Sequence, residues 1–313
     1  MRQPKPPVAG LGPVVAPVLT PFTVAGDPDA GRFVAHARWL LADGCTGLAP
    51  FGTTSEANSL GLNERKVLLV ALLAAGIDAE RLLPGTGLCN IPDTVELTRQ
   101  AVDVGCAGVL MLPPFYYKIV SDEGLYRYFA TVIEQVGSTR LRLYLYHIPP
   151  VAQVGFSQSL IARLQRDFPE VVVGLKDSSG DWAHTKALIE SFPGMKFYSG
   201  SEAAFLDNLR AGGAGSITAG ANINAALLSR IAGVYGREEA VAMQATVGAV
   251  RKAVQAQPMI PILKAIVAQT RSDPLWSRVR PPLESIPAEI ARPFIAKLAR
   301  ECGFRMDMHT PVT

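Results

Sequence analysis

At 313 residues, the chain is long enough for one large domain or two ordinary ones with a sizeable hydrophobic core. Its 30 lysines and arginines nearly balance its 27 acidic residues, and a net charge of +3 gives no reason to expect nucleic acid or an acidic membrane surface as a partner. Four cysteines far apart in the sequence predict neither a zinc site nor a disulfide framework, and the lack of an apolar run of about 18 residues predicts no membrane-spanning helix, so we expect a cytoplasmic protein.

The first part of the chain predicts a short arm followed by strands. Residues 1–13 carry several prolines and two basic side chains, without the apolar block of a signal peptide, and predict an irregular N-terminal arm. From residue 14 on, short apolar runs alternate with segments of helical spacing. Such runs are typical of parallel strands buried on both faces. The chain has eight of them, at 14–22, 46–52, 82–87, 108–113, 141–149, 171–176, 196–201 and 215–220.

Helical intervals separate these predicted strands; the helix after the third strand, for example, is expected to be capped near residues 93–94. Strands that alternate with helices predict an α/β fold with a parallel sheet, and eight such units close a (β/α)8 TIM barrel. We assign the barrel to residues 14–223. Strand signals stop there, and residues 224–313 predict a C-terminal helical appendage, with helices expected at 225–234, 238–257, 261–270 and 287–302.

Lys176 lies at the end of the sixth predicted strand, where the apolar run 171–175 meets the polar run 177–179. A lysine in this place needs an explanation, because its side chain is almost never fully buried without a partner. It can extend its ammonium to water or pair with Asp177. Alternatively, a low dielectric favours the neutral amine, which acts as a nucleophile toward a carbonyl carbon.

Barrel enzymes carry their chemistry at the carboxyl ends of the strands, so polar residues there are the candidates. Tyr146 ends the strand before that of Lys176, and we expect the two side chains to converge. This pair fits amine catalysis, in which the lysine condenses with the keto group of a 2-oxo acid and the tyrosine relays protons. Thr53 and Thr54, in the turn after the second strand, can donate hydrogen bonds to the carboxylate of the acid.

Each candidate also has a purely structural interpretation. Tyr146 can be a barrel-lining aromatic residue, and the turn 52–55 can be a helix cap, with Glu56 stabilising the helix start. Tyr116 and Tyr117, after the fourth strand, can be surface or interface packing. The four histidines lack metal-ligand spacing and are interpreted as structural, which leaves no predicted metal site: His36, His147, His184 and His309.

Three motifs resemble those of the dihydrodipicolinate synthase and N-acetylneuraminate lyase family, the pyruvate-type class I aldolases. They are Gly-Thr-Thr-Ser-Glu at 52–56, Tyr-His-Ile-Pro at 146–149 and Gly-Leu-Lys-Asp-Ser-Ser-Gly-Asp at 174–181. The similarity extends over nearly the whole chain. It implies a barrel enzyme that forms a Schiff base with its substrate and uses neither a metal nor an organic cofactor.

The resemblance also assigns roles to individual residues. Lys176 is implied as the Schiff-base lysine and Tyr146 as the proton relay. Thr53 and Thr54 supply the carboxylate and relay hydroxyls, and Gly200 and Ile217 line the keto-acid pocket. The family adds an aromatic hydroxyl from a neighbouring subunit, for which we prefer Tyr117 to Tyr116. The implied active unit is a homo-oligomer, a dimer of dimers.

One departure from the family bears on the substrate. Dihydrodipicolinate synthases have an arginine shortly after the proline of the tyrosine strand, whereas this chain has Val151. Valine cannot replace a bidentate carboxylate clamp, so we do not expect a true dihydrodipicolinate synthase. We predict a lyase that cleaves or condenses a pyruvate-type 2-oxo acid, with an aldehyde as a further partner. Two alternatives stay open: a 2-keto-3-deoxy-sugar-acid dehydratase using the same imine, and a family member that binds keto acids without turnover.

Overall fold

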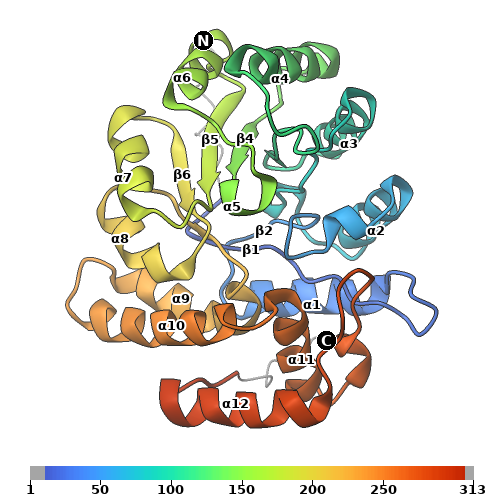
Figure 1. Cartoon of the computed structure of the whole chain (residues 1–313), viewed down its shortest axis with the longest axis vertical. Helices are drawn as coiled ribbons and strands as arrows, with labels where there is room; N and C mark the ends of the chain where they lie inside the picture. Colours follow the sequence, from blue (N-terminus) through green and yellow to red (C-terminus); the bar gives the residue numbers. More distant parts are fainter. Residues whose placement is uncertain (1–10, 307–313) are drawn as a thin grey trace, which may run out of the picture.

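The computed structural model describes residues 11–306, which form a parallel sheet surrounded by helices (Figure 1). Seven strands make up the sheet in the order β2-β1-β7-β6-β5-β4-β3. All neighbouring strands are parallel, and the curled sheet has a TIM-barrel-like α/β fold. The strands are β1 Val14–Ala16, β2 Gly47–Leu48, β3 Val109–Met111, β4 Leu143–His147, β5 Val172–Asp177, β6 Lys196–Ser199 and β7 Gly215–Ile217.

The strand expected at 82–87 is not a strand of the sheet, so the described chain has seven strands and not eight. This segment nevertheless lies between β2 and β3. Leu83 N–H donates to the carbonyl of Leu48 at 2.8 Å, and Leu110 N–H donates to the carbonyl of Pro84 at 2.9 Å. The Gly85 N–H and the Thr86 N–H also donate across the segment, to the carbonyls of Pro50 and Leu110. Pro84 has no N–H to donate, and the pairing consists of two isolated parallel bridges, Leu48 with Leu82 and Gly85 with Leu110.

Helices that follow the strands cover the outer face of the sheet. Several begin at a polar side chain that accepts a backbone N–H from the first turn, as Ser121, Ser157 and Asp181 do. The helix expected to be capped near 93–94 instead begins after Asn90, because this side chain accepts the N–H of Asp93. These helices are α1 Ala30–Ala42, α2 Leu62–Ala74, α3 Ile91–Asp103, α4 Asp122–Val136, α5 Pro149–Ala152, α6 Gln158–Asp167, α7 Trp182–Ser191 and α8 Phe205–Arg210.

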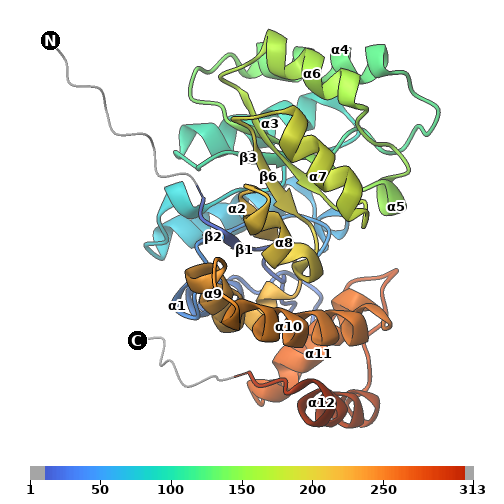
Figure 2. The same cartoon turned by 90° about the vertical axis from the view of Figure 1, so that its left-hand side faces the viewer.

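The C-terminal part of the described chain is helical, as predicted. It comprises the helices α9 Ala221–Val234, α10 Glu239–Gln255, α11 Met259–Thr270 and α12 Ala288–Cys302. Elsewhere and here, the described chain also has short 3-10 turns at Ala57–Ser59, Ala79–Arg81, Glu202–Ala204 and Pro274–Ser277. Helices α10, α11 and α12 lie together at one end of the molecule, beyond α1 and α9 (Figure 2). Most of the arm predicted at 1–13 falls outside the described residues. Among residues 11–306, no helix is both long and apolar enough to cross a membrane.

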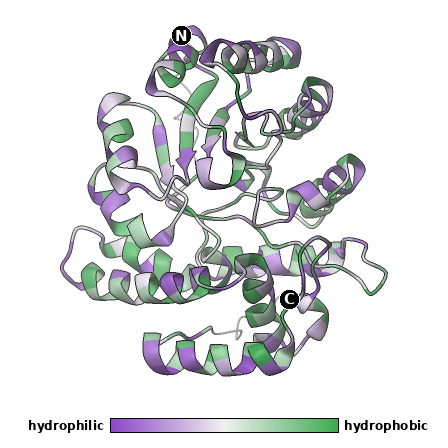
Figure 3. Cartoon of the chain, viewed as in Figure 1, coloured by the Kyte–Doolittle hydropathy of each residue, from purple (hydrophilic) through white to green (hydrophobic). Residues whose placement is uncertain are grey.

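Side chains of the strands alternate between two buried surroundings, and the strands combine apolar residues with polar ones, such as those at the carboxyl ends of β4 and β5 (Figure 3). Tyr144 and Tyr146 of β4 pack inside the curled sheet, whereas Leu143 and Leu145 pack against the outer helices. Period-two alternation therefore places Lys176 on the inner side with Tyr146. Gly174 is required on that side, because a Cβ there would lie 2.5 Å from the Tyr144 ring.

Candidate active site

Lys176 and Tyr146 are register partners on β5 and β4, near the carboxyl ends of both strands. The Lys176 side chain is buried, with 5% of the residue exposed. Its Nζ lies 4.1 Å from the centroid of the Tyr146 ring. The predicted convergence of the two side chains is thus present in the fold, and the ammonium lies against the electron-rich face of the ring.

Thr53 joins this pair from the loop after β2. Its Oγ1 lies 3.3 Å from the Tyr146 hydroxyl, and either oxygen can donate the hydrogen. Burial alone would raise the pKa of Tyr146, but the charge of Lys176 and the hydrogen bond to Thr53 outweigh it and hold the pKa of this phenol below its usual value. The phenol is therefore poised to exchange a proton more readily than an isolated buried tyrosine.

The loop that carries Thr53 and Thr54 is compact and backbone-strained. Phe51 and Glu56 flank it with positive φ angles of 63° and 56°, which non-glycine residues rarely adopt. Thr54 is buried in the same loop. Gly85 must lack a side chain, because a Cβ there would collide with the carbonyl of Phe51. A pocket opens beside Thr53 and Tyr146, lined further by Phe51, Gly52, Ala57, Asn58, Gly85, Gly87, Leu110 and Leu112.

Gly200 and Ile217, the two residues predicted to line the keto-acid pocket, are not among the residues that line the pocket beside Thr53. The Gly200 N–H donates to the Asp177 carbonyl at 2.6 Å, and a Cβ at Gly200 would collide with the hydroxyl of Ser178. The glycine therefore leaves room for Ser178 beside the lysine. Ile217 is fully buried in the same inner cluster as Tyr146.

Tyr117 does not join Lys176 in the described chain. It lies on the loop after β3, 71% exposed, and its ring packs edge-on against Tyr116 at 5.4 Å between centroids. Lys118 anchors this loop by donating to the Ala152 carbonyl of α5 at 3.0 Å. Val151, on the same short helix, is 62% exposed.

Glu56 does not have the role expected from its position in the sequence, which was to stabilise the start of the following helix. It is buried and makes a 2.6 Å ion pair with Lys264 of α11, so it does not stabilise the start of α2. Glu64 instead stabilises the start of α2, because its carboxylate accepts the Gly61 N–H at 2.8 Å. Sequence reasoning missed Lys264, since nothing in a helical segment 208 residues away marks it as the partner of Glu56.

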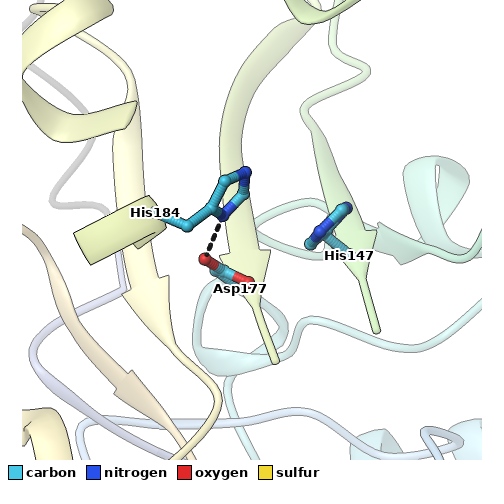
Figure 4. Close-up of side chains that lie close together, drawn as sticks. All are labelled: His147, Asp177 and His184. Carbon is cyan, nitrogen blue, oxygen red and sulfur yellow. Dashed lines mark hydrogen bonds and ion pairs between the residues drawn. The ribbon is translucent and has the colours of Figure 1, made fainter. Parts of the chain in front are cut away.

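A second polar group lies on the outer side of β4 and β5, where His147, Asp177 and His184 come together (Figure 4). His184 Nδ1–H donates to Asp177 at 2.9 Å, and the rings of His147 and His184 stack with centroids 5.1 Å apart. The spacing of the histidines in the sequence predicted no metal site and did not indicate that these three side chains come together. The fold creates it, because one residue after Tyr146 and one after Lys176 both face outward.

The His147 ring nitrogens determine what this group can bind. His147 Nδ1 accepts the Phe156 N–H at 3.0 Å, so a neutral His147 carries its proton on Nε2. A metal-bound histidine instead donates its second ring N–H to a neighbour. The hydrogen bonds therefore suit an anchor between strands and helices better than a metal site. His36 is likewise buried and bonded, and His309 lies outside the described residues.

A TIM-barrel-like sheet with a buried lysine against a tyrosine at its carboxyl edge defines an α/β protein whose candidate site lies where barrel enzymes carry their chemistry. The Dihydrodipicolinate synthetase family matches residues 11–300, and the chain belongs to this family.

Individual relatives agree with this assignment. The chain is 33% identical to an uncharacterized DapA-like lyase of Chloroflexus aurantiacus, over 83% of this chain and 87% of the relative. It is 31% identical to the 4-hydroxy-tetrahydrodipicolinate synthase of Rhizobium meliloti, over 77% and 82% of the two chains. The crystal structure of dihydrodipicolinate synthase from Agrobacterium tumefaciens superposes with a TM-score of 0.85 at 33% identity, covering 92% of this chain and 98% of that one.

Proposed function

We propose that the protein is a Schiff-base-forming lyase of the class I aldolase type, which cleaves or condenses a pyruvate-type 2-oxo acid through an imine on Lys176. The observation that carries the proposal is the buried Lys176 amine, 4.1 Å from the Tyr146 ring centroid, with Thr53 bonded to the Tyr146 hydroxyl. An amine in this surrounding attacks a keto carbon, and an adjacent phenol can move the protons that the attack requires.

The chemistry balances without a further reagent. The neutral amine adds to the keto carbon, and the carbinolamine loses its oxygen as water after protonation, leaving a protonated imine. In the cleavage direction, the hydroxyl on the carbon β to the imine carbon gives its proton to the Tyr146 and Thr53 relay, and the bond between the α and β carbons breaks. Its electrons form the double bond of an enamine while the C=N electron pair moves to nitrogen, and the aldehyde departs. Protonation of the enamine carbon and hydrolysis release the smaller keto acid. Because the imine itself accepts the electron pair, the proposal calls for no metal or organic cofactor.

Thr53 and Thr54 are the proposed seat of the substrate carboxylate, since their loop presents hydroxyl and backbone donors beside Tyr146. Gly200 and Ile217 line the space around the keto group. Tyr146, through Thr53, relays protons between the imine and the leaving or attacking oxygen.

A second copy of the chain completes the proposed site. The exposed rings of Tyr116 and Tyr117 and the fully exposed Ile119 form an apolar loop surface that suits burial against another subunit. Tyr117 then supplies its hydroxyl to the neighbouring site, and the assembly is a dimer of dimers.

We also infer that segment 82–86 closes the sheet into an eight-unit barrel. The segment donates a hydrogen bond to Leu48 and accepts one from Leu110, and it therefore connects β2 to β3. The proposed division is then a barrel at 14–223 and a helical region at 224–313, packed as one unit.

A trapping experiment tests the function. The protein is incubated with pyruvate, reduced with borohydride and digested, and the masses of its peptides are measured by mass spectrometry. We expect a carboxyethyl adduct on the peptide that contains Lys176 and none in the K176M variant. The peptide that contains Lys264, also a buried lysine, is the internal control and stays unmodified. A wild-type Lys176 peptide without adduct contradicts the proposal. Product analysis with candidate keto acids then separates aldol cleavage from loss of water.

A further inference from the structure

A buried ion pair connects the active-site loop to the C-terminal helices. Lys264 Nζ lies 2.6 Å from Glu56 Oε1, and the two side chains are 0% and 1% exposed. The Lys264 ammonium also lies 4.4 Å from the centroid of the Phe22 ring, in the loop after β1. Both charges are thus removed from water and depend on each other.

Glu56 is directly bonded to the residue that contacts Tyr146. Its backbone N–H donates to the Thr53 carbonyl at 3.1 Å, and the Thr53 hydroxyl lies 3.3 Å from the Tyr146 hydroxyl. Glu56 holds a left-handed φ of 56°, a conformation that persists in a non-glycine residue only when its surroundings impose it. A short path therefore runs from Lys264 through Glu56 and Thr53 to the phenol.

A second contact from the C-terminal region reaches the same loop. The Arg280 backbone N–H donates to Glu56 Oε2 at 2.9 Å, so both carboxylate oxygens of Glu56 are held from outside the barrel. The Arg280 guanidinium donates to the Ser59 carbonyl at 2.7 Å, and its Nη1 to Glu64 at 2.7 Å. The loop 52–60 is thus fixed at its middle and at its end by residues beyond 260.

We propose that Lys264 and Glu56 are positioning residues, through which α11 sets the position of the Thr53 hydroxyl relative to Tyr146. Stability alone does not account for this pair, because apolar residues of similar volume can replace a buried ion pair without loss of stability. The consequence for catalysis rests on the proposed function. The effect of Lys264 and Glu56 on the position of Thr53 does not depend on that function.

A double-mutant cycle between Lys264 and Thr53 tests the proposal. K264M removes the ammonium and keeps the stem, and T53V removes the hydroxyl. We expect K264M to slow adduct formation with pyruvate about tenfold in the wild-type background, and by less than about twofold in the T53V background, because Lys264 acts through Thr53. Equal losses in the two backgrounds contradict the proposal, since they are what independent destabilisation produces.

The matched control is K66M. Lys66 pairs with Glu96 at 2.7 Å, but the side chains are 35% and 47% exposed and lie on the outer helices. We expect this variant to match the wild type, because exposed ion pairs contribute little. E56Q, which keeps the shape of the side chain, replaces K264M if the latter does not fold, and is expected to act in the same direction.

A titration separates this proposal from the proposed function. The ultraviolet signal of Tyr146 is isolated by difference from Y146F, and we expect its midpoint to rise in K264M as it does in T53V. An unchanged Tyr146 midpoint in folded K264M overturns the positioning role, whatever the wild type does with pyruvate. A shifted midpoint in a protein that forms no pyruvate adduct removes the proposed function and leaves the positioning role intact.

Discussion

Tyr146 and Lys176 are paired in the parallel register of β4 and β5, and the lysine Nζ lies 4.1 Å from the centroid of the tyrosine ring. Both residues belong to strands whose backbone hydrogen bonds fix their spacing. The backbones of β4 and β5 therefore hold the two residues as direct neighbours, from which the amine and the phenol extend to the same side of the sheet. Placement on rigid strands holds reacting groups more tightly than placement on loops does.

Replacing Tyr146 with phenylalanine tests this relationship. Y146F keeps the ring over Lys176 and removes the hydroxyl. We expect turnover of the keto acid to fall by roughly 100-fold, the usual size of a general acid–base contribution. Y144F is the matched control, because Tyr144 lies two residues earlier on the same inner face. The steady-state turnover of both variants is compared with that of the wild type. Equal losses of turnover in Y146F and Y144F would contradict a specific role for the Tyr146 hydroxyl.

The pH dependence of turnover is expected to follow the phenol. The pKa of Tyr146 is lowered from its usual 10.0, since the Lys176 charge and the Thr53 hydrogen bond outweigh the effect of burial. Activity that needs the protonated phenol is therefore lost at a lower pH than for an ordinary tyrosine. T53V removes one of the interactions that lower this pKa, so its alkaline limb should move to higher pH. Measuring turnover against pH for the wild type and T53V checks this direction. A shift of the alkaline limb of T53V toward lower pH would contradict the assignment of this limb to Tyr146.

The sequence was sufficient for the fold wherever a buried strand has a long apolar run. β4 lies within the range expected for it, β5 ends one residue beyond its expected range, and α10 and α12 lie close to theirs. The segment at 82–87 has the same apolar character but contains Pro84. Its failure to form a strand depends on backbone hydrogen bonding, which hydrophobic pattern does not report. The start of α3 was missed for a similar reason, because Asn90 was the better-placed cap.

For the site, the sequence was sufficient where neighbouring strands bring residues together. The meeting of Tyr146 and Lys176 follows from strand order and alternation. The ion pair of Glu56 with Lys264 does not, because the packing of α11 decides it. Neither does the group around Asp177, since His184 reaches it from a helix whose rotation no motif specifies. Tertiary packing carries the information that these contacts need.

Val151 is expected to limit the choice of aldehyde. It lies on α5, directly after the Tyr146 strand, where the resemblance to the synthases implies an arginine that binds a carboxylate. V151R should improve the use of an aldehyde that bears a carboxylate by about tenfold, as one charge-assisted hydrogen bond can. V151K, which lacks the planar fork, should gain less. Values of kcat/KM decide the point, and an equal gain for an uncharged aldehyde would argue against a carboxylate contact.

His36 is expected to make the protein acid-sensitive. It is fully buried, and its ring contacts Asn222 and Arg271 at 3.0 and 2.9 Å. Burial and the charge of Arg271 lower the pKa of His36 from 6.5 to about 3. Between these values the unfolded chain binds one more proton than the folded chain does. The stabilisation is complete above the unfolded pKa and falls by about 1.4 kcal/mol per pH unit as the pH drops toward the folded pKa.

Thermal midpoints at fixed protein concentration measure this effect. We expect the midpoint of the wild type to fall as the pH drops below about 6.5, and the midpoint of H36Q to fall less steeply over the same range. H36Q is also expected to be less stable than the wild type at neutral pH, because the contacts of the ring are altered. Parallel slopes in the two proteins would show that other groups cause the acid sensitivity.

Metal removal is expected to leave the protein unchanged, and the reason lies in the hydrogen bonds around Asp177. One carboxylate oxygen accepts from His184 and, at 2.7 Å, from the Thr185 hydroxyl, while the other accepts the Ser179 N–H at 2.8 Å. His147 Nδ1 accepts from the backbone, so its neutral ring has no free lone pair. Dialysis against a chelator should therefore alter neither the thermal midpoint nor turnover. Titration with zinc or nickel, followed by calorimetry, is the stricter check: binding of one ion per chain that disappears in H184A would mean that the ion displaces these hydrogen bonds, and that His147 changes its tautomer to ligate it.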